Sequence, residues 1–188
     1  MNRFVLSVGY RHEVIIDYFG NSHSGAEIAY VIEKTPLGTG GGLLLAAKAV
    51  NKDEPFLLLN GDTYFAVDLK ELIEFSLTNN ADWCVSLFRT GEEGRYMGMD
   101  VSPQGQITSL KSGTVRPGRL ANGGVYWVQP CALLVSKFIY SGKIFLEDDI
   151  FPVVMASGQR LFGIEFSGPF IAIGMPDDYY RAPALFAL

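Results

Sequence analysis

The protein is a chain of 188 residues with a formal net charge of -5 and an isoelectric point near 5.0. Hydrophobic residues make up 48% of the sequence and charged residues 19%, which supplies a packed core and excludes a disordered chain. The length favours a single domain. The acidic balance argues against a nucleic-acid partner, which needs clustered Lys and Arg, but not against a local site for an anionic small molecule.

In chain order, the first half of the sequence alternates predicted strands with predicted helices. Strands are expected at 4–10, 28–32, 55–60 and 83–88, and helices at 13–19, 41–50 and 69–77. The run PFLLLN at 55–60 is apolar at nearly every position, which is typical of a parallel strand buried on both faces. The alternation predicts βαβ units and an α/β fold, in which helices cover both faces of a mainly parallel sheet.

The second half changes character. It predicts a hairpin over 99–110 with Pro103 and Gly105 in its turn, strands at 125–128, 161–166 and 170–174, a helix at 146–156 and a final helix from Pro176. No internal repeat or linker interrupts it, so we expect one domain over 1–188. The opening strand is followed by SVGYRHE, which has one glycine and is no dinucleotide fingerprint. If the sheet needs a glycine-rich phosphate turn there, that turn lies outside these residues.

The cysteine pattern bears on the cellular compartment. Cys84 and Cys131 lie in apolar runs without metal-ligand spacing, and we expect both to be buried thiols. No disulfide framework and no signal-peptide hydrophobic region are visible, which predicts a cytoplasmic protein. The apolar runs are too short to span a bilayer, so no membrane partner is expected.

The stretch EKTPLGTGGG joins a predicted strand to a predicted helix. Its glycines would let the backbone approach a planar or phosphate ligand and would expose N–H groups at the helix start, while Thr39 could cap that helix. A flexible strand–helix connection explains the stretch equally well. The stretch matches neither of the standard nucleotide-binding glycine motifs.

Two further segments carry candidate polar residues. In LLLNGDTYF, Asp62 follows a predicted strand at the edge where open α/β sheets bind ligands. A divalent cation could bind its carboxylate there. The alternative is an ordinary Asx turn. In ANGGVYW, Asn122 offers a donor and an acceptor, and the following glycines would clear space for a bulky ligand or make a tight turn.

The acidic run LEDDIFP is the last candidate. Glu147 could accept hydrogen bonds from sugar hydroxyls, while Asp148 and Asp149 could favour a helix N-terminus. A solvated acidic face is the more common role of such a run.

Taken in order, these segments resemble the sugar-phosphate nucleotidylyltransferase family over essentially the whole chain. The resemblance rests on LSVGYRHEVIIDYFG, EKTPLGTGGG, FLLLNGDTYFAVDL, NGGVYW, LEDDIFP and IGMPDDYYRA. Within the family it is strongest to the D-glycero-D-manno-heptose 1-phosphate guanylyltransferases, with mannose-1-phosphate guanylyltransferases next. It implies a three-layer αβα sandwich with a mainly parallel mixed sheet, of the Rossmann-like nucleotide-diphospho-sugar transferase type, lacking its first strand. Residues 1–188 would then be one N-terminally truncated domain.

The resemblance also implies a reaction and its residues. A heptose or hexose 1-phosphate attacks the α-phosphorus of a nucleoside triphosphate, and pyrophosphate leaves. The subfamily resemblance implies GTP as the triphosphate. The nucleotide-binding positions are then Leu37, Gly38, Thr39, Gly40, Gly41 and Gly61, and the sugar-binding positions are Asn122, Gly123 and Glu147. Asp62 matches the catalytic carboxylate that holds Mg²⁺.

The sequence departs from the family at the phosphate end of this site. The glycine-rich signature loop with its Arg and Lys is absent, Asp148 replaces a common Lys, and Ala172 replaces the second metal-binding Asp. We therefore expect impaired turnover, with a catalytically inert nucleotide- or sugar-nucleotide-binding domain as the alternative function and mannose or glucose 1-phosphate as alternative substrates. A missing strand would leave an open sheet edge, which predicts either self-association or a marginal monomer.

Overall fold

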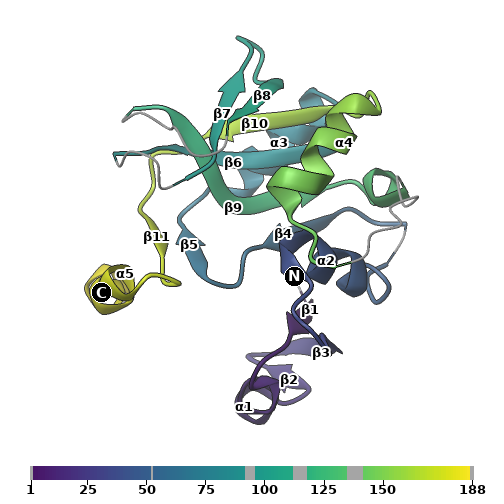
Figure 1. The fold of residues 1–188 in the computed structure, drawn as a ribbon, viewed down its shortest axis with the longest axis vertical. Coiled ribbons are helices and arrows are strands. Elements are labelled where there is room, and N and C mark those ends of the chain that lie inside the picture. The colour runs from purple at the N-terminus through teal and green to yellow at the C-terminus, as the bar shows by residue number, and fades with distance from the viewer. Residues whose placement is uncertain (1, 52, 92–95, 112–117, 135–141, 187–188) are drawn as a thin grey trace.

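A computed structural model describes residues 2–51, 53–91, 96–111, 118–134 and 142–186 (Figure 1). The helices are α1 His12–Phe19, α2 Gly38–Ala46, α3 Leu69–Thr78, α4 Phe151–Ala156 and α5 Pro176–Phe186. The strands are β1 Arg3–Val8, β2 Ser22–His23, β3 Ala26–Ile32, β4 Phe56–Leu59, β5 Thr63–Phe65, β6 Trp83–Arg89, β7 Gly98–Val101, β8 Ile107–Lys111, β9 Leu120–Val128, β10 Leu161–Glu165 and β11 Phe170–Ala172. A 3₁₀ turn covers Pro130–Leu134, and a wide π-helical turn, Leu146–Ile150, leads into α4. The predicted order of strands and helices is confirmed.

The strands form three groups. The small sheet has the strand order β1-β3-β2. The main sheet has the order β10-β6-β9-β7-β8, and β4 also pairs with β9. The third group is the pair of β11 with β5. β1 and β3 are parallel, as are β6 and β10, whereas β9 runs antiparallel to β4, β6 and β7. The α/β class and the mixed character of the sheet are confirmed. The main sheet has more antiparallel pairs than expected, because the long central strand β9 runs against β4, β6 and β7.

Strand β4 corrects one expectation. Its apolar sequence predicted a parallel strand buried on both faces, but β4 pairs antiparallel to β9, and the structure shows no second partner among the described residues. Phe56, Leu57 and Leu58 are half-buried, and Leu59 is 53% exposed. The strand is apolar enough for a central position, yet it lies at an edge.

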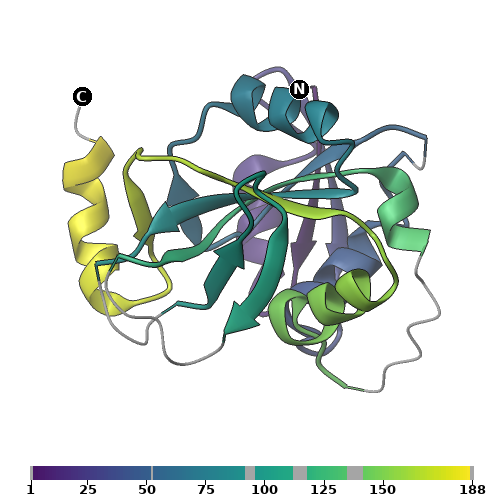
Figure 2. The same cartoon turned by 90° about the horizontal axis from the view of Figure 1, so that it is seen from above.

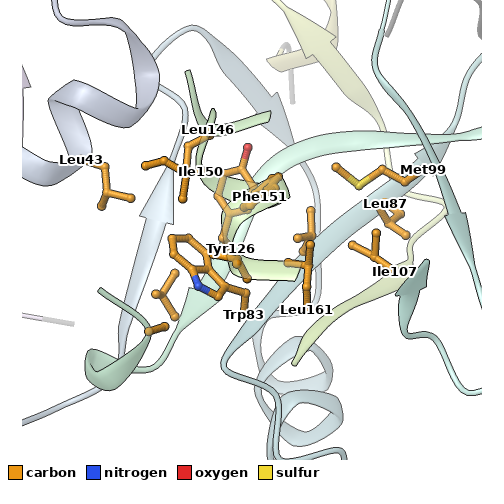
Figure 3. Close-up of a cluster of buried hydrophobic side chains, with 14 of the residues drawn as sticks. Leu43, Trp83, Leu87, Met99, Ile107, Tyr126, Leu146, Ile150, Phe151 and Leu161 are labelled. Atoms are coloured by element: carbon orange, nitrogen blue, oxygen red, sulfur yellow. The ribbon is translucent and has the colours of Figure 1, made fainter. Parts of the chain in front are cut away.

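Helices cover both faces of the main sheet, with α3 on one face and α4 on the other (Figures 1 and 2). Because side chains alternate along a strand, β6 sends Trp83, Val85 and Leu87 to one core and Cys84 and Phe88 to the other. The α4 core is drawn in Figure 3, where the Trp83 and Phe151 rings meet edge to face with centroids 5.6 Å apart. Two cores back to back confirm the layered arrangement.

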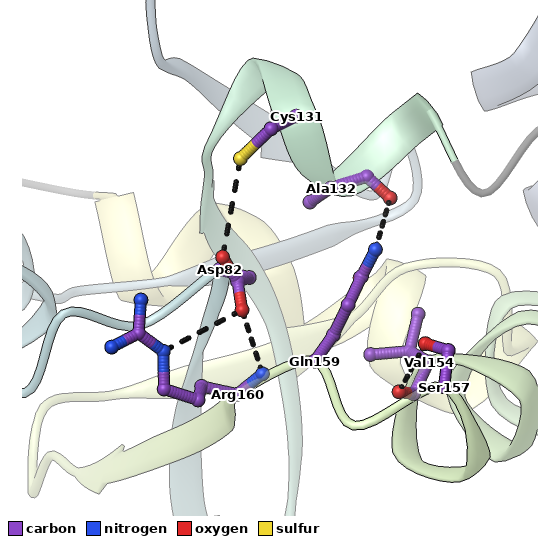
Figure 4. Close-up of polar contacts among 7 residues, drawn as sticks. All are labelled: Asp82, Cys131, Ala132, Val154, Ser157, Gln159 and Arg160. Carbon is purple, nitrogen blue, oxygen red and sulfur yellow. Dashed lines mark hydrogen bonds and ion pairs between the residues drawn. The ribbon is translucent and has the colours of Figure 1, made fainter.

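A polar cluster connects the starts of β6 and β10 (Figure 4). Asp82 Oδ2 accepts a hydrogen bond from the Arg160 backbone N–H at 2.7 Å and lies 3.7 Å from Arg160 Nε. Cys131 Sγ lies 3.9 Å from Asp82 Oδ1. The expectation of a buried thiol is wrong for Cys131, which is exposed, and is confirmed for Cys84. Burial raises the pKa of Cys84 to about 12, which keeps it a neutral thiol.

The small sheet lies at the other end of the molecule, beside α1 and α2 (Figure 1). None of the residues in α1 is buried. Within the described residues, β1 pairs with β3 along one edge, and β4 pairs with β9 along one edge. In the described residues, β1 and β4 therefore each have one unpaired edge, and these two strands flank the region that contains the candidate site residues. No helix in the described ranges has the length and apolar character needed to cross a membrane.

Candidate active site

A cleft of about 1040 Å³ lies between β1, β4 and the start of α2. Its polar end is lined by Glu33, Gly38 and Thr39 on one side and by residues Asn60 to Asp62 on the other. These residues follow the carboxyl ends of β3 and β4, which is where open α/β sheets bind ligands. The cleft is therefore lined by residues of three of the four segments that the sequence singled out: the glycine segment, the turn that carries Asp62, and Leu146 of the acidic run.

The glycine segment is the first turn of α2 rather than a loop before it. Predicted to begin at Gly41, the helix begins at Gly38, which has a left-handed φ of +78°. A Cβ on Gly38 would lie 2.4 Å from the Ile144 carbonyl oxygen, and the N–H groups of Gly40 and Gly41 donate to that same oxygen at 2.9 and 3.2 Å. This corrects the expectation that these N–H groups are free for a ligand: two of them bind the chain itself, and Gly40 and Gly41 are buried.

Thr39 links the glycine segment to the acidic run. It does not cap α2, because the helix's N-cap position, Leu37, makes no side-chain capping bond and Thr39 lies inside the first turn. Instead, Thr39 Oγ1 accepts a hydrogen bond from the Leu146 N–H at 3.0 Å, and the Ile144 N–H donates to the Leu37 carbonyl oxygen at 2.7 Å. The turn that carries Glu147 is thereby held against the start of α2.

Glu33 is a site residue that the sequence reasoning missed. Its Oε1 accepts from Ser7 Oγ at 2.9 Å, and its Oε2 accepts from the Leu37 N–H at 3.0 Å. A half-buried carboxylate thus fixes the entry into α2 from the end of β3. The signal was present in the sequence, because Glu33 is an acid at a strand end and the first residue of the stretch EKTPLGTGGG, five residues before Gly38.

Asp62 lies on the exposed turn between β4 and β5. The antiparallel pairing of β11 with β5 puts Ala172 opposite Thr63, and a Cβ on Gly174 would lie 2.9 Å from Asp62 Oδ2. The strand that bears Ala172 therefore runs close to Asp62. No group of three His, Cys, Asp or Glu side chains that could hold a metal occurs among the described residues. The site fits Mg²⁺ only in the mode that uses one carboxylate and takes its other ligands from phosphates and water.

Asn122 is the centre of a hydrogen-bond network beside the cleft. Its Nδ2 donates to Glu147 Oε1 at 2.7 Å and to the Tyr126 hydroxyl oxygen at 2.6 Å, and its Oδ1 accepts from the Gly124 N–H at 3.0 Å. The Tyr126 hydroxyl in turn donates to Asn60 Oδ1 at 3.5 Å. Asn122 and Glu147, predicted as sugar-binding residues from distant parts of the sequence, are brought into direct contact.

Burial sets the protonation behaviour of this network. Desolvation raises the pKa of the half-buried Glu147 carboxyl above its ordinary value, and the hydrogen bond from Asn122 offsets part of that shift. Burial, with the nearby Glu147 charge, also raises the pKa of the fully buried Tyr126 hydroxyl, which therefore stays a neutral donor.

The glycines after Asn122 do not clear space for a ligand. They lie inside β9, which begins at Leu120 rather than at the predicted Val125. A Cβ on Gly123 would lie 2.4 Å from the Phe65 ring, and one on Gly124, whose φ is +75°, would lie 2.6 Å from Thr63 Oγ1. The paired glycines let β5 pack against β9, and a contact of Gly123 with sugar stays a prediction.

The predicted site residues thus fall into three groups. Gly38, Thr39, Gly61 and Asp62 line the cleft. Asn122 and Glu147 form the hydrogen-bonded pair that reaches the cleft through Tyr126 and Asn60. Leu37, Gly40, Gly41 and Gly123 serve contacts within the chain.

The chain is similar to known proteins along nearly its whole length. The family model described as "Nucleotidyl transferase" matches residues 2–186. The chain is 34% identical to D-glycero-alpha-D-manno-heptose 1-phosphate guanylyltransferases of Aneurinibacillus thermoaerophilus, over 97% of this chain and 77% of that protein, and of Campylobacter jejuni, over 94% and 76%. The crystal structure of HddC from Yersinia pseudotuberculosis complexed with GMP-PN is similar with a TM-score of 0.80 at 28% identity, over 97% of this chain and 77% of that one.

The family model covers nearly every residue, and both relatives match across almost the full length. The fold, the order of the motifs and the convergence of Asp62 with the glycine segment on one cleft are consistent with that match. The chain therefore belongs to the nucleotidyl transferase family.

Proposed function

We propose that the chain is a sugar-phosphate guanylyltransferase, which transfers GMP from GTP to a heptose 1-phosphate and releases pyrophosphate. The observation that carries the proposal is the meeting of the α2 glycine turn and Asp62 in one cleft, with the Asn122–Glu147 pair hydrogen-bonded through Tyr126 to Asn60 in the lining of that cleft. The two relatives are named as heptose 1-phosphate guanylyltransferases, which supports guanine as the base and a heptose as the sugar over the alternatives, mannose 1-phosphate and glucose 1-phosphate. We place the reaction in the cytoplasm.

In the proposed reaction, a phosphate oxygen of the sugar 1-phosphate forms a bond to the α-phosphorus, and the bond from that phosphorus to the bridging oxygen of pyrophosphate breaks. Positioning and charge neutralisation supply most of the catalysis in such transfers. We expect Mg²⁺ to be bound by the Asp62 carboxylate and by phosphate oxygens of the nucleotide. The bound ion would offset the charge on the phosphates.

The Asn122–Glu147 pair is suited to a sugar. The Glu147 carboxylate offers acceptors for hydroxyl groups, and Asn122 holds it in one orientation through a bond of 2.7 Å. Because Asn122 is itself fixed by Tyr126 and by the Gly124 N–H, the pair is preorganised before a sugar arrives.

A specific observation favours the second candidate function, an inert nucleotide- or sugar-nucleotide-binding domain. The described residues that line the cleft include the carboxylates Glu33 and Asp62 but no lysine or arginine. A triphosphate carries several negative charges, and losing one well-placed charge stabiliser costs about 10²- to 10³-fold in rate. Binding of the guanosine and sugar parts would then survive with little turnover.

Two measurements together distinguish an active guanylyltransferase from an inert binding domain. Calorimetry with GTP, other nucleoside triphosphates and GDP-mannose measures binding, and pyrophosphate release from GTP with heptose, mannose or glucose 1-phosphate measures turnover. Asp62→Asn should lower turnover about 10²- to 10³-fold, whereas Glu54→Gln, which alters an exposed acid at the opposite end of β4, should not change it. Binding without pyrophosphate release selects the inert domain, and absence of both overturns the proposal.

A further inference from the structure

We propose that Pro152 is a positioning residue of the site: its ring imposes the wide turn Leu146–Ile150, and that turn directs the Glu147 carboxylate at Asn122. Pro152 is exposed and is not among the described residues that line the cleft, so it acts through the backbone. The consequence for a sugar rests on the proposed function, whereas the consequence for the turn does not.

The turn is wider than an α-helical turn by one residue. The Ile150 N–H donates to the Phe145 carbonyl oxygen at 3.2 Å, and the Phe151 N–H donates to the Leu146 carbonyl oxygen. Both bonds reach back five residues, where an α-helix reaches back four. The Phe145 oxygen also accepts from the Asp149 N–H at 3.0 Å, which is the α-helical spacing. The extra residue therefore enters at Ile150.

A proline two residues later explains the extra residue. Pro152 is the second residue of α4. A proline ring inside a regular helix clashes with the carbonyl group four residues before it, here that of Asp148, and proline has no N–H to donate to it. Adding a residue to the preceding turn moves the Asp148 carbonyl away from the ring. Kinks in helices are found at prolines and at such wide turns, and here the two lie together.

The extra residue lets three apolar side chains reach one core. Leu146, Ile150 and Phe151 are 1%, 2% and 0% exposed and belong to the same cluster (Figure 3). In a regular α-helix, Phe151 would lie about 140° around the axis from Leu146, so the two could not share a face. The wide turn brings Phe151 back to the face of Leu146.

This arrangement directs Glu147. The preceding residue, Leu146, is held by its buried side chain and by the bond from its N–H to Thr39 Oγ1 at 3.0 Å. The half-buried Glu147 carboxylate accepts from the Asn122 amide at 2.7 Å. Removing one residue from the turn would rotate the chain before it by about 100° relative to α4. Because the buried Phe151 anchors α4, that rotation would carry the Glu147 carboxylate away from Asn122.

The test replaces the proline with alanine. Pro152→Ala restores an N–H at an exposed position and leaves no cavity. Scalar couplings across hydrogen bonds, measured by NMR, identify the carbonyl group that each N–H contacts. We expect the Ile150 N–H to couple to the Phe145 carbonyl in the parent chain and to the Leu146 carbonyl in the variant.

The orientation of Glu147 is measured in the same two proteins. The coupling from the Asn122 side-chain amide to the Glu147 carboxyl group should be lost in Pro152→Ala. The KM for heptose 1-phosphate should rise about tenfold or more, as for a lost hydrogen bond to a charged group, while the KM for GTP stays unchanged. If the parent chain binds without turnover, the dissociation constants of GDP-mannose and GTP give the same comparison.

Two further variants separate the proline ring from other causes. Pro183→Ala removes a proline from inside α5 and should change neither the couplings nor either KM. Asp149→Ala removes the side chain whose Oδ2 accepts from the Phe145 N–H at 2.7 Å, and the coupling from Ile150 to Phe145 should persist in it. Should Pro152→Ala not fold, Pro152→Ser removes the same ring and gives the same readings.

Four results would each overturn the proposal. They are a parent chain in which the Ile150 N–H couples to Leu146, an unchanged coupling of Ile150 in Pro152→Ala, its loss in Asp149→Ala, and an unchanged contact of Asn122 with Glu147 in Pro152→Ala. Equal changes in the KM values for sugar phosphate and GTP would also contradict it. A parent chain that neither turns over nor binds ligand refutes the proposed function instead, and the couplings then still decide whether Pro152 positions Glu147.

Discussion

At the scale of single residues, the Asn122 amide is the most connected group of the site. Its three hydrogen bonds join a carboxylate, a buried hydroxyl and a backbone N–H, in segments up to 25 residues apart. Each partner is half-buried or buried, so losing the amide leaves groups that water reaches poorly. One side chain therefore supports both the stability of β9 and the orientation of Glu147.

Asn122→Ala is expected to lower the free energy of unfolding by about 2 to 3 kcal/mol, because it leaves two buried or half-buried partners unsatisfied. Urea denaturation measures the change. Asn21→Ala, at an exposed position, is the matched control and should stay within about 0.5 kcal/mol of the parent chain. A loss below 0.5 kcal/mol in Asn122→Ala would show that the network is not formed in solution.

The raised pKa of Glu147 predicts how stability depends on pH. Its ordinary pKa is 4.5 and its folded-state pKa is higher, so between these two values the folded state binds more protons than the unfolded state. The contribution of Glu147 to stability is therefore complete below pH 4.5 and is lost as the pH rises through the folded-state pKa.

Glu147→Gln removes that titration. Measured by urea denaturation from pH 4 upwards, the parent chain should lose more stability than the variant across this window. Parallel curves for the two proteins would contradict a raised pKa.

At the scale of elements, close packing explains the glycines better than ligand access does. Gly38 combines a left-handed backbone with a carbonyl oxygen 2.4 Å from its Cβ position, and Gly123 and Gly124 are enclosed by β5. The sequence shows where the chain needs glycine. It does not show whether a ligand or another strand occupies the space, because both demand the same missing side chain.

Gly38→Ala should therefore destabilise the protein by about 3 kcal/mol, from backbone strain together with the clash against Ile144. Gly91→Ala is the control, since a Cβ there meets nothing within 4 Å and its φ is not left-handed. Thermal unfolding compares the two. Similar melting temperatures for both variants would mean that the start of α2 can move away from Ile144.

At the scale of the whole molecule, two open strand edges border one apolar cleft. Edges of this kind pair with other chains unless they are blocked by charge or covered. The expected outcomes are self-association or a marginally stable monomer, as the sequence already indicated.

Sedimentation across a range of concentrations tests this. The parent chain should associate as concentration rises, and Leu59→Lys, which adds a charge beside the β4 edge, should associate less. Thr78→Lys, at an exposed position at the end of α3, is the control and should behave like the parent chain. A parent chain that stays monomeric throughout and unfolds at high temperature would refute the prediction.

The sequence by itself determined the α/β class and the order of the main strands and helices. These follow from local signals, because apolar periodicity and turn residues are read within a short stretch of chain. The resemblance of its motifs, taken in order along the whole chain, indicated the family and the candidate site segments. Tertiary structure alone decided that β9 runs against its neighbours, that β4 is an edge strand, that Gly40 and Gly41 bind Ile144, and that Glu33 holds the entry to α2. Each of these depends on which distant segment becomes the neighbour, and a residue's own sequence surroundings do not contain that information.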